Sequence, residues 1–159
     1  MYTNQTETFP HVSSQGNMYM LVLSHIDSDS IWVDPMKSRT EGEMILARRW
    51  ALQQMQAVGI KPKRQVLNNE TIMTYRQEIT GTGMTFQLVP PDEYRRNIAE
   101  KKIQTWKYHF IAVCSGVSTN FPIHLWCRLI PQAEKKFSTT QTIKCQPKNF
   151  SFCSPIWNA

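Results

Sequence analysis

The stretch Met18–Val33, MYMLVLSHIDSDSIWV, decides how this chain folds. Its first half, Met18–His25, is a mostly apolar run rich in β-forming residues, and it predicts a strand. Asp27–Ser30 is a cluster of turn-forming residues, and Ile31–Val33 predicts a further strand that should end at Asp34-Pro35. Two strands joined by so short a turn should pair antiparallel.

The pattern on either side of this pair extends the prediction. Met1–Phe9 predicts a short first strand, so three strands in a row form an antiparallel meander. Downstream, apolar residues at steps of three and four from Met44 to Val58 predict a helix over residues 41–58, with Arg48 turned away from its apolar face. Thr40 and Glu43 fit a capping box at its start, in which both side chains satisfy free backbone amides.

The rest of the chain alternates between strand and helix patterns. The predicted elements are a strand over Arg64–Leu67, a short helix over Thr71–Thr80, a strand over Met84–Val89, and helices over Ile98–Val113 and Pro122–Glu134. This order predicts an α/β fold with a mixed five-stranded sheet, three antiparallel strands first and helices on both faces. We expect one domain over residues 1–135 and a weakly patterned tail over residues 136–159.

Composition narrows the possible partners. The formal net charge is +6 and the sequence pI is near 9.3, which suits a polyanion such as nucleic acid, although a merely basic protein is the alternative. No run of about 18 apolar residues occurs, so no membrane partner is expected. The four cysteines form no C-x-x-C pair, so a structural zinc site is not expected. We expect the thiols to be reduced and the chain to lie in an intracellular setting.

Several short motifs, in order, resemble the integrases of Copia-type retrotransposons, which have a ribonuclease H-like fold. The resemblance covers about residues 2–135. The motifs are Gly16–Met20 at the second strand, Lys61–Lys63 leading into Val66–Glu70 where the family has "DNE", Leu88–Pro91 before Arg95–Glu100, Phe121–Trp126, and Leu129–Glu134.

The resemblance implies a catalytic site of two aspartates and a glutamate that hold Mg²⁺ or Mn²⁺. Aligned residue by residue, the first aspartate falls on Asn4, the second on Asn68, and the glutamate on Glu100. Only Glu100 keeps its charge, and it is therefore the one retained metal-ligand position. Magnesium prefers charged oxygen ligands, and a neutral amide cannot bridge two divalent ions as a carboxylate does.

The substitutions lead us to expect weak or lost metal binding and impaired catalysis. Glu7 and Asp27 could in principle replace the missing carboxylates, but neither is predicted to point at Glu100. Natural decay and deliberate inactivation both fit the double change from Asp to Asn. Whether the chain is an enzyme therefore stays open at this point.

The resemblance also implies a DNA-binding face. Gln104 and Lys107 follow Glu100 along one side of the same predicted helix, while Arg95 and Arg96 precede it, and all four are candidates for phosphate contacts. A solvated basic surface is the alternative. Non-specific DNA binding, a homodimer and a nuclear location are implied by the family. The function expected is that of a DNA-integrating polynucleotidyl transferase core that is catalytically impaired, and the alternatives are a non-catalytic DNA-binding or assembly module and a relic without function.

Overall fold

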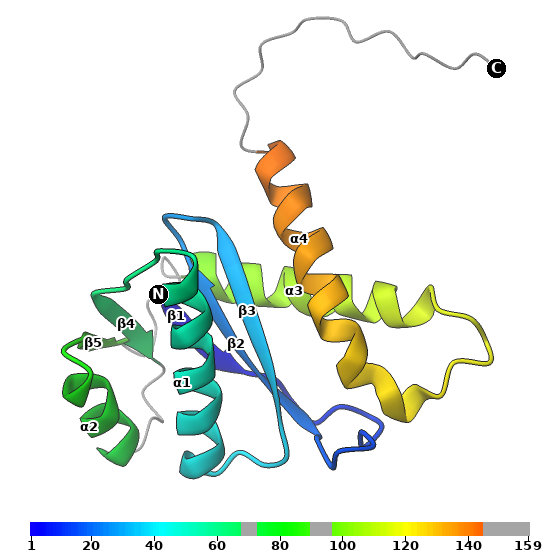
Figure 1. Cartoon of the computed structure of the whole chain (residues 1–159), viewed down its shortest axis with the longest axis horizontal. Helices are drawn as coiled ribbons and strands as arrows, with labels where there is room; N and C mark the ends of the chain where they lie inside the picture. The colour runs from blue at the N-terminus through cyan, green and yellow to red at the C-terminus, as the bar shows by residue number, and fades with distance from the viewer. Residues whose placement is uncertain (68–72, 90–96, 145–159) are drawn as a thin grey trace, which may run out of the picture.

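A computed structural model describes residues 1–67, 73–89 and 97–144, and Figure 1 shows them as one mixed sheet with helices on both faces. The sheet has five strands in the order β3-β2-β1-β4-β5. The strands are β1 (Tyr2–Gln5), β2 (Tyr19–His25), β3 (Ser30–Met36), β4 (Arg64–Leu67) and β5 (Thr85–Leu88). The first three pair antiparallel, and β4 pairs parallel with both β1 and β5. The predicted fold class, including its antiparallel start, is confirmed.

The helices divide between the two faces of the sheet. They are α1 (Glu41–Ala57), α2 (Met73–Gly81), α3 (Asn97–Ser115), the 3-10 helix η2 (Ile123–Leu129) and α4 (Ile130–Lys144). Leu21 and Leu23 of β2 pack into a core with α1 and α2, whereas Met20 and Val22 pack into a second core with α3, η2 and α4. The alternation of β2 side chains between faces therefore builds both cores.

Three details of the predicted elements are wrong. β3 does not end before Pro35 but continues to Met36, because β3 is an edge strand, where a missing N–H costs no ladder bond. Helical structure after residue 122 is split between η2 and α4, and α4 continues to Lys144, into the segment predicted to be weakly patterned. Val58 lies just past α1 and is 66% exposed.

The predicted capping box is also absent. Thr40 is the residue before α1, but its side chain makes no capping hydrogen bond. Its hydroxyl instead lies 2.9 Å from that of Ser38, and the carboxylate of Glu43 accepts a hydrogen bond from the Lys37 amide at 3.2 Å. The preceding turn therefore takes up both side chains.

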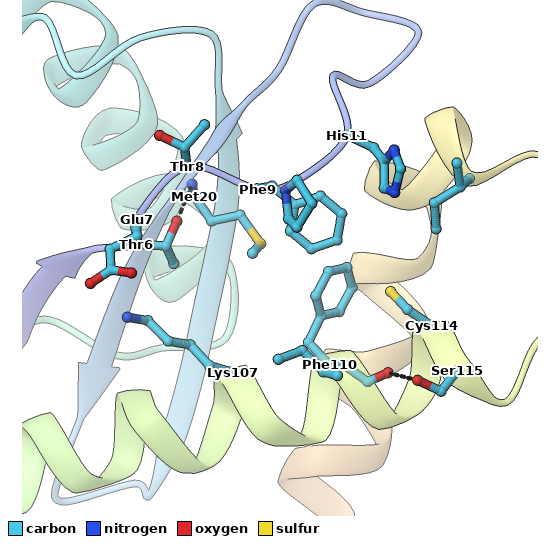
Figure 2. Close-up of a pocket in the computed structure, with 13 residues that line it drawn as sticks. Thr6, Glu7, Thr8, Phe9, His11, Met20, Lys107, Phe110, Cys114 and Ser115 are labelled. Atoms are coloured by element: carbon cyan, nitrogen blue, oxygen red, sulfur yellow. Dashed lines mark hydrogen bonds between the residues drawn. The ribbon is translucent and has the colours of Figure 1, made fainter.

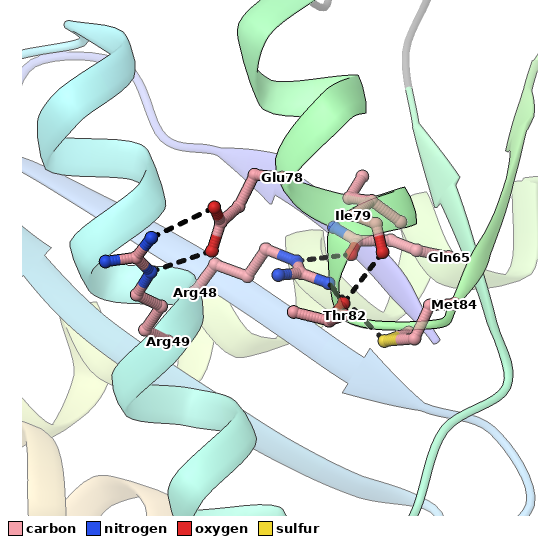
Figure 3. A network of polar contacts seen from close by, with 7 residues as sticks. All are labelled: Arg48, Arg49, Gln65, Glu78, Ile79, Thr82 and Met84. Carbon is pink, nitrogen blue, oxygen red and sulfur yellow. Dashed lines mark hydrogen bonds and ion pairs between the residues drawn. The ribbon is translucent and has the colours of Figure 1, made fainter.

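Arg48 is fully buried, contrary to the prediction that it falls away from the apolar face of α1. Its Nε donates to Gln65 Oε1 at 2.9 Å, and its Nη2 donates to Thr82 Oγ1 at 3.0 Å (Figure 3). The amide of Gln65 in turn donates to Thr3 Oγ1 at 2.8 Å and to the Tyr75 hydroxyl at 3.2 Å. Burial lowers the pKa of Arg48. This network links α1, β1, β4 and α2 on the face of the sheet that α1 and α2 cover.

Two acidic side chains lie near the outer edge of β3. The carboxylate of Glu134, from α4, accepts a hydrogen bond from the Val33 amide at 2.6 Å. Burial raises the pKa of Glu134 to about 7, and the nearby charge of Asp34 adds to this effect. Burial likewise raises the pKa of Asp34 to about 6, with a contribution from Glu43. Both carboxyl groups therefore bind a proton more tightly in the folded chain than in the unfolded one.

The raised pKa of Glu134 predicts that its contribution to the free energy of unfolding falls as pH rises. The contribution of Glu134 is present below its unfolded pKa of 4.5 and is lost as pH rises through its folded pKa of about 7. Glu134→Gln keeps an oxygen acceptor for Val33 and removes the titration. The unfolding free energy of the variant minus that of the unmodified chain should therefore increase between about pH 5 and pH 8, by on the order of 1–3 kcal/mol. A difference that stays constant with pH would contradict this assignment.

Candidate functional site

Asn4 lies on β1, on the face of the sheet that α3 covers. It is paired directly with Val22 in the antiparallel ladder, and opposed residues of such a pair share a face. Val22 packs into the core with α3, so Asn4 is on that side too. Asn4 is half-buried, and its Oδ1 accepts a hydrogen bond from the Gln5 amide at 2.8 Å.

Glu100 lies in the first turn of α3 and is exposed. The start of α3 is fixed to the turn between β2 and β3, because Lys102 Nζ lies 2.6 Å from Asp29 Oδ1. The Lys102 side chain is only 8% exposed, whereas that of Asp29 is 41% exposed, so solvent reaches the ion pair from the aspartate side. Figure 1 shows α3 crossing the sheet, and it packs against β1 and β2. The strand that carries Asn4 and the helix that carries Glu100 are therefore neighbours.

The third predicted metal-ligand position, Asn68, lies outside the described residues, as do Arg95 and Arg96. Asn68 directly follows Leu67, the last residue of β4, and β4 pairs with β1 through Tyr2 and Val66. Within the ranges 1–67, 73–89 and 97–144, no three or more His, Cys, Asp or Glu side chains form a group that could hold a metal ion. The convergence of positions 4, 68 and 100 stays a prediction.

A cavity of about 510 Å³ lies beyond the end of β1, between residues 6–11 and the second half of α3. Figure 2 shows Phe9 and Phe110 on its walls, with the Lys107 side chain extending along one end toward Thr6 and Glu7. Gln104, one turn before Lys107, is exposed, and its amide lies 3.5 Å from the Tyr108 hydroxyl. No local sequence pattern predicts this cavity, because its walls come from segments that are distant along the chain.

The order of strands and helices is that of a ribonuclease H-like fold. A chain in the cryo-EM structure of the simian T-cell lymphotropic virus intasome in complex with the PP2A regulatory subunit B56 gamma superposes with a TM-score of 0.65 at 12% identity. The match covers 99% of the present chain and 59% of that chain, so the present chain spans less than two thirds of its structural neighbour. No protein-family model matches the sequence, and no curated protein matches it. The likeness establishes the fold alone.

No helix in the described part of the chain is long and apolar enough to cross a membrane. Cys114 and Cys127 are free thiols, and Cys127 is buried.

Proposed function

We propose that this chain is the nucleic-acid-binding core of a Copia-type retrotransposon integrase whose metal centre is impaired. The observation that carries the proposal is the position of Asn4 on the α3 face of β1, because α3 carries Glu100 in its first turn. In a ribonuclease H-like sheet this juxtaposition is where the resembling family keeps its carboxylates. The proposed activity is therefore DNA binding, with strand transfer reduced or lost.

The donor groups of this chain do not fit a centre of two divalent ions. Glu100 supplies one carboxylate, whereas position 4 supplies a neutral amide whose oxygen already accepts the Gln5 N–H. Position 68 is also an asparagine in the sequence. Two adjacent divalent ions repel each other unless carboxylates neutralise them, so one carboxylate with two amides should bind Mg²⁺ or Mn²⁺ weakly.

DNA is the partner that this fold and charge support. The chain has a net charge of +6, and a duplex carries one negative charge per roughly 1.7 Å of its axis. Lys107 forms no ion pair within the described residues, so its charge is available to a phosphate. Arg95, Arg96 and Gln104 are proposed as further contacts from their place beside Glu100 in the sequence. A homodimer and a nuclear setting belong to the same proposal.

Removing Lys107 should weaken DNA binding in a way that depends on salt. Each phosphate contact releases about one counterion, so Lys107→Ala should lower the slope of log affinity against log salt by about 1. Fluorescence anisotropy with a labelled duplex, measured over a series of salt concentrations, checks the slope. Arg128→Ala is the matched control, because Arg128 is an exposed cation on η2 that does not line the cavity beside Lys107. Equal slopes for Lys107→Ala and the unmodified chain would remove Lys107 from the interface.

The same titration distinguishes the proposed DNA-binding function from the alternative that the chain is a relic without function. A merely basic chain without a DNA-binding role should bind a duplex weakly at low ionic strength, and Lys107→Ala should then change its salt slope no more than Arg128→Ala does.

A further inference from the structure

A second concave surface lies at the start of β4. It has a volume of about 600 Å³ and is lined by the turn from Gly59 to Arg64, together with His25 and Asp27 from the end of β2 and the turn that follows. Three of the six residues in the turn are cations, namely Lys61, Lys63 and Arg64. We call this surface the β4 basic surface.

The three cations of the β4 basic surface are exposed. Within the described ranges, none of the three side chains forms an ion pair or a hydrogen bond. The one carboxylate on the surface, Asp27, is 92% exposed and lies 3.7 Å from the His25 ring. The surface therefore carries an excess of positive charge that no carboxylate on it neutralises.

The backbone that presents these cations is held in place on both sides. Gly59 adopts a left-handed conformation with φ of +80°, and the Ile60 amide donates to the Met55 carbonyl at 2.9 Å. The carbonyl of Lys63 accepts the Thr85 amide at 3.0 Å, which ties the turn to β5. Pro62 removes further backbone freedom. A fixed backbone lowers the entropic cost of holding a charged ligand.

The β4 basic surface is joined to the site around α3 by one short turn. His25 and Asp27 line the surface, and Asp29, two residues later, forms the ion pair with Lys102 near the start of α3. A ligand that spans both regions would therefore follow the turn between β2 and β3. An extended polyanion has this reach, whereas a small anion does not.

We propose that the β4 basic surface binds the sugar-phosphate backbone of DNA, as a contact region separate from Lys107. This inference rests on the proposed DNA-binding function and adds the residues that hold a further stretch of duplex. Charge complementarity selects the ligand, because three unpaired cations face a polymer with closely spaced phosphates.

The test compares two variants that each lose three charges. One is K61A/K63A/R64A on the β4 basic surface, and the other is R128A/K135A/K136A on η2 and α4, which Figure 1 places at the other side of the molecule. The probe is a fluorescein-labelled duplex of about 30 base pairs titrated at several salt concentrations. The first variant should lower the salt slope by about 2–3, and the second should lower it by less than about 1. A charge-preserving variant, K61R/K63R/R64K, should keep the original slope.

The outcomes distinguish this inference from the proposed function. If K61A/K63A/R64A keeps the original slope while Lys107→Ala lowers it, the β4 basic surface is not a DNA contact and the proposed function stands. Equal losses in the two triple variants would show an effect of net charge alone and overturn the inference. No DNA binding by the unmodified chain would overturn both. Binding of the unmodified chain to phosphatidylserine vesicles, without binding to the duplex, would also overturn both. Thermal unfolding of each variant checks that it is folded.

Discussion

Replacing both asparagines, Asn4→Asp and Asn68→Asp, should raise the affinity for Mg²⁺ or Mn²⁺ by at least roughly 100-fold. Loss of a group that merely orients a metal ligand already costs about 10- to 100-fold in affinity, so restoring two ligands should have a larger effect. Asp and Asn have nearly the same shape, so the change should leave the fold intact. Either single reversion should recover little, because groups that hold the ions together act as a unit. Calorimetric titration with Mn²⁺ measures the gain.

Glu100 provides the control for this result. Adding Glu100→Gln to the double revertant should abolish the gain, because the third carboxylate is then missing. Glu41→Gln in the same background removes a carboxylate from the start of α1 and should leave the gain intact. A double revertant that binds no metal would show that positions 4, 68 and 100 do not converge.

Arg48→Ala should destabilise the fold by about 3 kcal/mol or more, because it opens a cavity and removes charged hydrogen bonds in the interior. Its partners Gln65 and Thr82 would lose their donor, and α1 would lose its polar link to β4. Urea unfolding measures the loss. Arg48→Met, which fills most of the same volume without the donors, should cost less than Arg48→Ala. A variant Arg48→Met more stable than the unmodified chain would show that the buried guanidinium is a net burden.

The next residue in the chain supplies a matched comparison. Arg49 is 58% exposed, and its Nε lies 2.7 Å from Glu78 Oε1. Figure 3 shows both arginines on α1; Arg49 is exposed, whereas Arg48 is buried. Exposed ion pairs contribute little because water and salt screen them, so Arg49→Ala should destabilise far less than Arg48→Ala. Similar losses for the two variants would contradict the role assigned to the buried network.

Local pattern was sufficient to predict the order of elements. β2 matches the predicted strand to within one residue, and α1 begins and ends within one residue of its predicted bounds. Apolar periodicity reports which residues face a core, and that depends only on neighbours along the same element. The prediction for Pro35 failed because edge position depends on the order of strands in the sheet, which no local pattern contains.

The burial of Arg48 is a second feature that the sequence pattern did not predict. A polar residue beside an apolar stripe is normally exposed, so the periodicity predicted a solvated arginine. It is buried because Gln65 and Thr82, which lie 17 and 34 positions away, accept its hydrogen bonds. A buried polar network becomes visible only when its distant members are placed together.

Some parts of the candidate site can be predicted from the sequence, and others need the folded structure. Asn4 and Glu100 were found from motif order, and the structure places them on a strand and a helix that pack together. The cavity beside Lys107 and the β4 basic surface were not predicted, because each is built from segments that meet only in the folded chain. The motif Lys61-Pro62-Lys63 is part of the family resemblance, but only the folded structure shows that its two lysines form no ion pair within the described residues.

The proposed metal site keeps one carboxylate where the resembling family has three, so we expect the unmodified chain to bind divalent metal only weakly. Titration of Mn²⁺ into the unmodified chain, followed by the electron paramagnetic resonance signal of free Mn²⁺, tests this most directly. The free signal should track the added metal up to about 1 mM, because one carboxylate and two amides leave the ions uncompensated. Loss of the free signal in proportion to the protein at micromolar metal would contradict the account, since it would show a competent site in the chain as it stands.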